Sequence, residues 1–180
     1  MKLNRPLFET AKANYLALAQ SCVPTSEVLG WYLQAQRFAV ELTEICPHWT
    51  LEVACSVISS FSPRNKWITN KAHAYQFALG KNPKGLKNNL RMANASTRLG
   101  FNALKGLKTY NFARAIAGNQ NAVVIDTWML KAAGLDSSKG VSKGNYSTLA
   151  QAVHAVAKET GWNPIATQAA IWCAIRGGHA

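Results

Sequence analysis

Apolar residues recur along most of this chain at the spacing of an α-helix, whereas the two-residue alternation of a β-strand is scarce. Leu7, Ala11, Tyr15 and Leu18, for example, fall on one face of the first predicted helix. The pattern therefore predicts an all-α fold. The predicted helices cover Leu7–Ala19, a segment from the turn Val23–Glu27 to Cys46 with Thr25 or Ser26 as its cap, Leu51–Phe61, Lys66–Leu79, Leu86–Leu99, a segment from Lys108 or Thr109 to Ala117, a segment from Trp128 to Gly134, Tyr146–Thr160 and Pro164–Ile175, and the longest loop covers Asp136–Asn145.

Two interruptions of the helical pattern are informative. Leu51–Phe61 is almost wholly apolar, which predicts that this helix lies at the centre of the fold with Thr50 as its cap. Pro63 cannot continue the helix, so a loop of small polar residues is expected to follow. Gly106 is costly inside a helix, and it predicts a tight turn between a short helix that starts at Phe101 and the next helix.

The charge of the chain is strongly positive and unevenly placed. Twenty Lys and Arg against eight Asp and Glu give a formal net charge of +12. No acidic residue lies between Glu52 and Asp126, whereas eleven Lys and Arg do. This stretch favours a polyanionic partner, above all nucleic acid, because neutralised phosphates release counterions. A solvated basic surface is the alternative, and a membrane is disfavoured because the basic residues do not follow one amphipathic helix.

Cysteine and histidine give no sign of a metal or cofactor site. Cys22, Cys46, Cys55 and Cys173 lack the spacing of a zinc or iron–sulfur site, and the four histidines are equally dispersed. The cysteines are expected to be small buried groups in a reducing cytoplasm. The N-terminus lacks the apolar core of a signal peptide, and no apolar run is long enough to span a membrane. We expect a cytoplasmic monomer without cofactor or metal.

Asp126 is a single carboxylate inside an apolar run. Val123–Ile125 precedes it and Trp128–Leu130 follows it. An aspartate just before a helix ordinarily accepts hydrogen bonds from the backbone amides two and three residues on, and by itself this cap interpretation outweighs a catalytic one by roughly two to one. A catalytic role for Asp126 therefore needs support from other segments of the chain.

The turn at Gly106 has the composition of a phosphate clamp. The backbone amides at the start of the following helix face a phosphate, and Lys105 and Lys108 add positive charge. Leu107 and Thr109 complete the turn. Glycine turns between helices are common, so the turn alone does not specify DNA.

Three segments together resemble the helix-hairpin-helix DNA glycosylases, the superfamily of endonuclease III. Lys105–Asn111 aligns with their hairpin, and Val123–Trp128 aligns with the element that carries their catalytic aspartate, here Asp126. Asp126 follows Lys108 by 18 residues, which is the separation in the lyase-type members. Val57–Ala72 is similar to their buried helix and the loop after it. In this chain Leu104 stands at the family's first hairpin glycine, Trp128 replaces a histidine, and the four-cysteine cluster is absent.

The resemblance implies a fold and a set of roles. It implies one two-lobed helical domain over residues 1–180, with the hairpin at about 101–118, the catalytic segment at about 122–134, and the active-site cleft between the lobes. Asp126 then stabilises the cationic sugar or activates water, and Lys108 either forms a Schiff base with C1′ or contacts a phosphate. Trp67 and Trp128 either stack on the extruded base or are core residues. The expected DNA contacts are Ser62, Arg64, Asn65, Lys66, Lys105, Gly106, Leu107 and Thr109.

The function that follows from the resemblance is base excision. A flipped damaged or modified base is removed and an abasic site remains. By analogy with the family, the base is either an ordinary lesion or a bulky modified base of phage DNA such as glucosylated hydroxymethylcytosine. Two alternatives stand beside it: a non-catalytic DNA-binding module, and an enzyme of the same fold that remodels a modified base without excising it.

Overall fold

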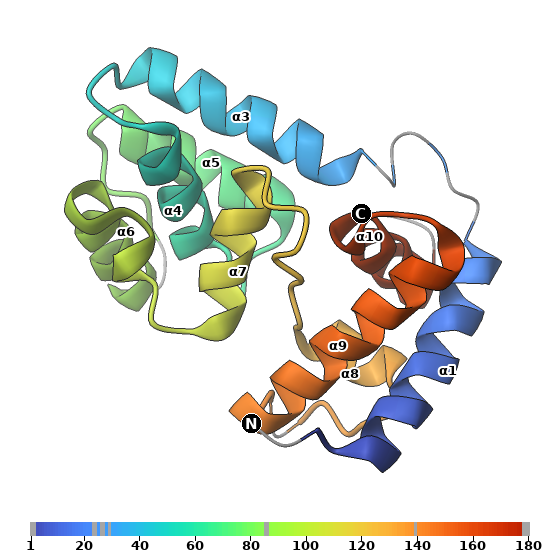
Figure 1. Cartoon of the computed structure of the whole chain (residues 1–180). Helices are drawn as coiled ribbons and strands as arrows, with labels where there is room; N and C mark the ends of the chain where they lie inside the picture. Colours follow the sequence, from blue (N-terminus) through green and yellow to red (C-terminus); the bar gives the residue numbers. More distant parts are fainter. Residues whose placement is uncertain are drawn as a thin grey trace. The chain divides into compact units, whose positions relative to one another are not determined.

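The computed structural model describes residues 3–22, 25, 28, 30–84, 87–138 and 140–177. Within these ranges the regular structure is helical and contains no strand, which confirms the predicted all-α class. Residue contacts divide the chain into two compact units (Figure 1). The terminal unit comprises Met1–Tyr32 and Gln120–Ala180, and the central unit comprises Leu33–Asn119.

The terminal unit is built from the two ends of the chain. Its helix α1 packs along α9 and against α10, and α8 packs against α10 (Figure 1). Because residues far apart in sequence share this packing, neither end forms the unit alone. The bounds are Arg5–Ser21 for α1, Thr127–Ala132 for α8, Lys143–Thr160 for α9 and Pro164–Ile175 for α10.

Each helix of the terminal unit contributes to one hydrophobic core. Tyr15 of α1, Met129 of α8, Leu149 of α9 and Ile171 of α10 are fully buried in it. The Tyr15 hydroxyl donates a hydrogen bond to the backbone oxygen of Met129 at 2.9 Å. A buried phenol needs such a partner, and this one ties α1 to α8.

The helix boundaries of the terminal unit follow from their caps. The side chain of Asn163 accepts from the backbone amide of Ala166 at 2.8 Å, and α10 has the predicted bounds. The start of α9 differs from the prediction of a loop up to Asn145. The Ser142 hydroxyl accepts from the Asn145 amide at 3.2 Å, so the helix begins at Lys143. The cap outweighs the weak helix propensity of the Gly and Asn in the first turn.

Helix α4 is the centre of the central unit, as predicted. It contacts α5, α6 and α7, and every residue from Ala54 to Phe61 is buried. Thr50 caps α4 by accepting from the Val53 amide at 3.3 Å. The elements of this unit are α3 (Trp31–Ile45, which starts in the terminal unit), α4 (Leu51–Phe61), α5 (Trp67–Ala78), α6 (Lys87–Leu99), the 3₁₀ helix η1 (Gly100–Ala103) and α7 (Leu107–Ile116).

Several predicted boundaries shift by one residue or fall outside the described residues. Helix α7 begins at Leu107, one residue before the predicted start, and the predicted short helix before the turn is the single 3₁₀ turn η1. Leu86, Ser26 and most of the Val23–Glu27 turn lie outside the described residues. Thr25 is described, and its hydroxyl accepts from the Val28 amide at 3.2 Å, as expected of a cap.

The cysteines differ in their exposure to solvent. Cys46, Cys55 and Cys173 are buried as predicted, and Cys22 is partly exposed. Burial raises the pKa of the Cys55 thiol to about 12 and raises that of Cys46 as well, so neither is a thiolate at neutral pH. No group of three metal-binding side chains occurs among the described residues. None of the described helices is long and apolar enough to cross a bilayer.

Candidate functional site

The segment before Asp126 is extended, buried and held by one tyrosine. Val123 and Ile125 are at most 2% exposed. The Tyr146 hydroxyl of α9 donates to the Val123 carbonyl at 2.9 Å and accepts from the Ile125 amide at 3.3 Å. Two bonds from one hydroxyl to this short segment set the direction in which the chain enters α8.

Asp126 is the cap of α8, as its sequence position indicates. Its Oδ1 accepts from the amides of Trp128 at 2.9 Å and Met129 at 3.0 Å. Its Oδ2 accepts from the indole Nε1 of Trp172, which lies on α10, at 3.2 Å. A carboxylate has about four acceptor positions, so Oδ2 of the half-buried Asp126 keeps one for a further donor. The carboxylate is thus fixed in direction and still able to accept a proton or a water hydrogen.

Two buried phenols of the terminal unit are influenced by the charge of Asp126. Burial, followed by the negative charge of Asp126, raises the pKa of Tyr15 and of Tyr32 well above the ordinary value. The buried Tyr32 hydroxyl donates to Oε1 of Gln168 at 2.6 Å. Because these phenols remain protonated, they add no negative charge to the surroundings of Asp126.

Two tryptophans near the carboxylate each have a cation over their ring. Lys131 Nζ lies 4.5 Å from the Trp128 ring centroid. The Arg176 guanidinium lies 4.3 Å from the Trp172 ring centroid and 5.6 Å from that of Trp128. Of these two tryptophans and two cations, only Trp128 was among the site residues predicted from the sequence. The spacings Trp128–Lys131 and Trp172–Arg176, three and four residues, were visible signals of same-face pairs.

The loop after α4 contains the one described non-glycine residue with positive φ. Arg64 has φ 63°, and its side chain is exposed. Asn65 Nδ2 donates to the Phe61 carbonyl at 2.8 Å, and Asn89 Nδ2 donates to the Pro63 carbonyl at 3.1 Å. These bonds hold the backbone on both sides of Arg64. Strained residues of this kind concentrate at functional sites, so the loop is a candidate contact region.

Two polar atoms near this loop are buried without a partner. Ser62 Oγ and Asn70 Oδ1 accept or donate no hydrogen bond among the described residues. Each such atom costs about 1–3 kcal/mol relative to a satisfied one. Lys66 at the end of the loop is exposed, so the loop offers Arg64 and Lys66 to solvent while Ser62 faces inward.

The predicted turn residues differ in accessibility. Lys105, Gly106 and Leu107 are exposed, and Lys108 is half-buried. Thr109 is buried, its hydroxyl donates to the Gly106 carbonyl at 3.0 Å, and its own carbonyl accepts from Ser59 Oγ of α4 at 2.7 Å. Thr109 therefore fastens the turn to α4, and Lys105 of the turn remains exposed.

Trp67 packs inside the central unit. Its ring meets those of Phe38 and Phe112 edge to face, with centroids 6.3 Å and 6.5 Å away. Lys71 Nζ lies 5.8 Å from its centroid. These contacts are those of a packing residue, the second of the two roles expected for Trp67.

Positive charge is concentrated in the central unit. Leu33–Asn119 holds twelve Lys and Arg and three Glu, hence +9 of the formal +12. Among the described residues the one ion pair joins Lys12 and Glu159, both of the terminal unit. The basic residues of the central unit are thus without carboxylate partners in the described part of the chain.

The predicted site residues divide between the units. Asp126 and Trp128 belong to the terminal unit, and all the others belong to the central unit. Within the central unit, the Ser59–Thr109 bond brings the end of α4 to the start of α7. The Ser62–Lys66 loop follows α4 directly, so both predicted DNA-contact regions border the same buried helix.

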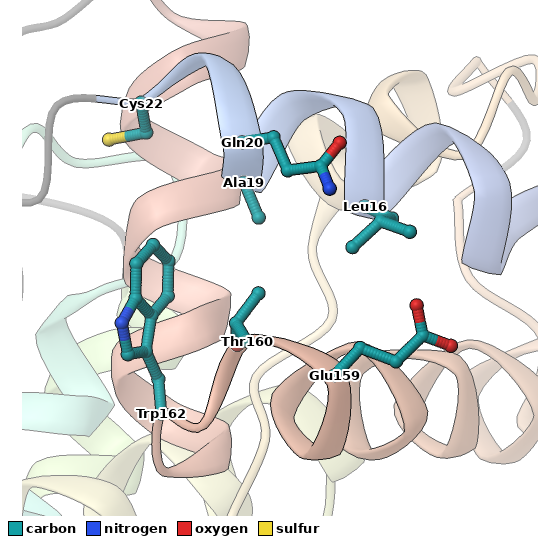
Figure 2. A pocket seen from close by; sticks show the side chains of 7 residues that line it. All are labelled: Leu16, Ala19, Gln20, Cys22, Glu159, Thr160 and Trp162. Carbon is teal, nitrogen blue, oxygen red and sulfur yellow. The ribbon is translucent and has the colours of Figure 1, made fainter.

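The terminal unit also contains a pocket. Figure 2 shows it between the end of α1 and the corner that joins α9 to α10, with a volume of about 380 Å³. The one carboxylate that lines the pocket, Glu159, forms an ion pair with Lys12. Burial raises the pKa of the Cys22 thiol, which also lines the pocket. None of the predicted site residues lines it, so it gives no support for a catalytic centre. The lining residues are Leu16, Ala19, Gln20, Cys22, Glu159, Thr160 and Trp162.

Comparison with known proteins places the chain in one family. Residues 21–179 match a family of unknown function (DUF7178). No curated protein and no solved structure matches the chain. The match extends over α3 to α10 and so includes Asp126, Lys108 and the Ser62–Lys66 loop. Because the match covers most of its length, the chain belongs to this family of unknown function, DUF7178.

Proposed function

We propose that this protein is a DNA glycosylase, which hydrolyses the N-glycosidic bond of a damaged or modified base and leaves an abasic site. The observation that carries the proposal is the Asp126 carboxylate, fixed by three hydrogen bonds with one acceptor position left on Oδ2. The resemblance of Lys105–Asn111 and Val123–Trp128 to the helix-hairpin-helix glycosylases supports it.

The chemistry requires little beyond a fixed carboxylate. As the bond from C1′ to the base nitrogen breaks, the sugar becomes cationic and the base leaves with the electron pair. The Oδ2 atom of Asp126 stabilises that cation or takes a proton from the water that attacks C1′. A preoriented carboxylate is effective because it does not need to reorganise during the reaction.

DNA binding is assigned to the central unit with its formal charge of +9. The amides around Gly106 and the side chains of Lys105 and Lys108 bind phosphates. The strained loop with Arg64 and Lys66 contacts the duplex where the nucleotide is extruded. In this proposal η1, the turn and α7 act as a helix-hairpin-helix motif.

The proposal includes the organisation of the whole protein. The chain is proposed to act as one two-lobed glycosylase-like domain, 1–180, with Asp126 in its active site. The enzyme is a cytoplasmic monomer that acts on double-stranded DNA. The substrate base is either an ordinary lesion or a bulky phage modification such as glucosylated hydroxymethylcytosine, and it is identified by the first experiment below.

The first experiment compares base release by the wild type, Asp126→Asn and Asp136→Asn. The substrates are plain, oxidised, alkylated and phage-modified duplexes, and released bases are identified by mass. The asparagine at 126 can still cap α8, so the fold is kept while the carboxylate is lost. Asp136 is a matched control, because its carboxylate also accepts bonds from a nearby residue, Ser138. Full base release by Asp126→Asn overturns the proposal.

A second experiment tests Lys108. Borohydride reduces a Schiff base to a stable adduct, so a trapped DNA–protein adduct that is lost in Lys108→Ala assigns a lyase role to its amine. A wild type that releases base but never traps DNA leaves Lys108 as a phosphate contact. The lysine serves equally in both roles, and the glycosylase step does not depend on the outcome.

The charge of the central unit also fits a non-catalytic DNA-binding module. That function predicts tight, salt-dependent DNA binding with no abasic site on any substrate. It leaves Asp126 as a helix cap only. Mass analysis of the DNA separates both functions from remodelling of a base without excision, since remodelling changes the mass of the intact strand.

A further inference from the structure

The terminal unit carries two cations that are held in place by indole rings. Arg176 lies over Trp172 and within reach of Trp128, and Lys131 lies over Trp128. Both cations are exposed, and both indoles are half-buried. The rings therefore serve as a supporting surface from which the two charged groups face solvent.

Local sequence and helix geometry explain why the groups are ordered. Arg176 follows Trp172 by four residues and Lys131 follows Trp128 by three, so each cation lies on the same helix face as its indole. Stacking restricts side chains that otherwise sample many rotamers. Each cation also lies at the C-terminal end of its helix, where the carbonyls favour positive charge.

These cations have no carboxylate partner among the described residues. Asp126 directs Oδ1 to two backbone amides and Oδ2 to the Trp172 indole, and it forms no ion pair with either cation. The one described ion pair is Lys12–Glu159. Two ordered, exposed and uncompensated positive charges are the elements of an anion site.

We propose that Lys131 and Arg176 bind a backbone phosphate of DNA, in a second phosphate-binding region that is separate from the basic turn at Gly106. The guanidinium binds two phosphate oxygens and the ammonium contributes a point charge. This inference rests on the proposed function, because it takes DNA as the ligand. It adds a contact that anchors the strand next to Asp126, because the Trp172 indole contacts both Asp126 and Arg176.

The test measures the salt dependence of binding to a plain duplex. Each neutralised phosphate contributes about 0.9 to the slope of log K against log salt for double-stranded DNA, so Lys131→Ala with Arg176→Ala, which removes one phosphate contact, lowers the slope by about 0.9. The matched control is Lys143→Ala with Lys158→Ala, two exposed lysines of α9 in the same unit. The control removes the same charge and keeps the wild-type slope.

A charge-retaining variant separates charge from structure. Lys131→Arg with Arg176→Lys keeps both cations and keeps the slope within the error of the wild type. If the exchange loses as much slope as the double alanine variant, the effect is structural and the inference is wrong. The inference is also wrong if the double alanine variant has the same salt slope as its control. It is wrong as well if the double alanine variant loses binding to phosphatidylserine vesicles but not to DNA.

The outcomes of the two proposals are distinguishable. If base release depends on Asp126 but the double alanine variant keeps the wild-type salt slope, this inference is wrong and the glycosylase proposal stands. A reduced slope without base release on any substrate removes the glycosylase and retains the phosphate contact. A wild type that does not bind DNA at all overturns both.

Discussion

The indole of Trp172 donates a hydrogen bond to Oδ2 of Asp126 at 3.2 Å, across 46 residues of sequence. The other carboxylate oxygen is held by backbone amides of its own helix. Local capping and a distant indole together hold the carboxylate in one orientation.

Trp172→Phe keeps the ring and removes the donor. A hydrogen bond to a charged group is worth about 1.5–3 kcal/mol, and we expect the free energy of unfolding to fall by about that amount. Urea unfolding measures this loss. For the proposed glycosylase, kcat for base release is expected to fall about tenfold or more, because Asp126 loses its fixed direction. Trp162→Phe, in the pocket of Figure 2, is the control with unchanged kcat. If KM and kcat both fall in Trp172→Phe and in Trp162→Phe alike, the effect is not specific to Trp172 and its positioning role is wrong.

Gly100 leaves room for the carboxylate of Glu52. It has φ 51°, and a Cβ there lies 2.1 Å from Glu52 Oε1, which accepts from the Phe101 amide at 2.9 Å. Gly100→Ala therefore strains the backbone and displaces this hydrogen bond, which together cost about 2–3 kcal/mol of unfolding free energy. Gly80→Ala is the matched control, because Gly80 has φ 73° and open space around its Cβ position. It is expected to cost about 1–2 kcal/mol. Equal losses in the two variants argue against the role of Glu52.

Arg64 is predicted to store backbone strain. Arg64→Gly and Arg64→Ala both remove its charge, but only glycine adopts φ 63° without a steric cost. We expect the glycine variant to be more stable than the alanine variant by about 1 kcal/mol in urea unfolding. Their DNA affinities should fall equally, since the lost charge is the same. Identical stabilities show that the loop relaxes around this residue.

His154 makes stability depend on pH. Burial is the main cause that lowers its pKa from 6.5, and Lys158 lowers it further against the opposing backbone bond of Asn121. The unfolded chain therefore binds more protons below about pH 6.5. This contribution to stability is complete above that pH and is lost as the pH falls through the lower folded pKa. His154→Gln, which does not titrate, is expected to show a weaker decrease in melting temperature between pH 7 and pH 5. A decrease as steep as that of the wild type would exclude His154 as the cause.

Much of the helical structure was predictable because its determinants are local. The bounds of α4 and α10 agree with the sequence prediction, since apolar periodicity and the caps Thr50 and Asn163 lie within a few residues of them. The cap role of Asp126 was equally accessible, because its acceptors and donors are two and three residues apart. The start of α9 was missed because a segment rich in Gly, Ser and Asn is typical of a loop, and only the Ser142 cap decides otherwise.

By itself, the amino-acid sequence determined the all-helical class, the central position of α4, the basic character of Leu33–Asn119 and the place of Asp126 at a helix start. Tertiary structure alone decided that Trp172 holds Asp126, that Arg176 reaches two indoles, and that Tyr32 bonds to Gln168. The physical reason is range: caps and periodicity act over one or two helical turns. Contacts between side chains on different helices depend on how those helices pack, which no short segment specifies.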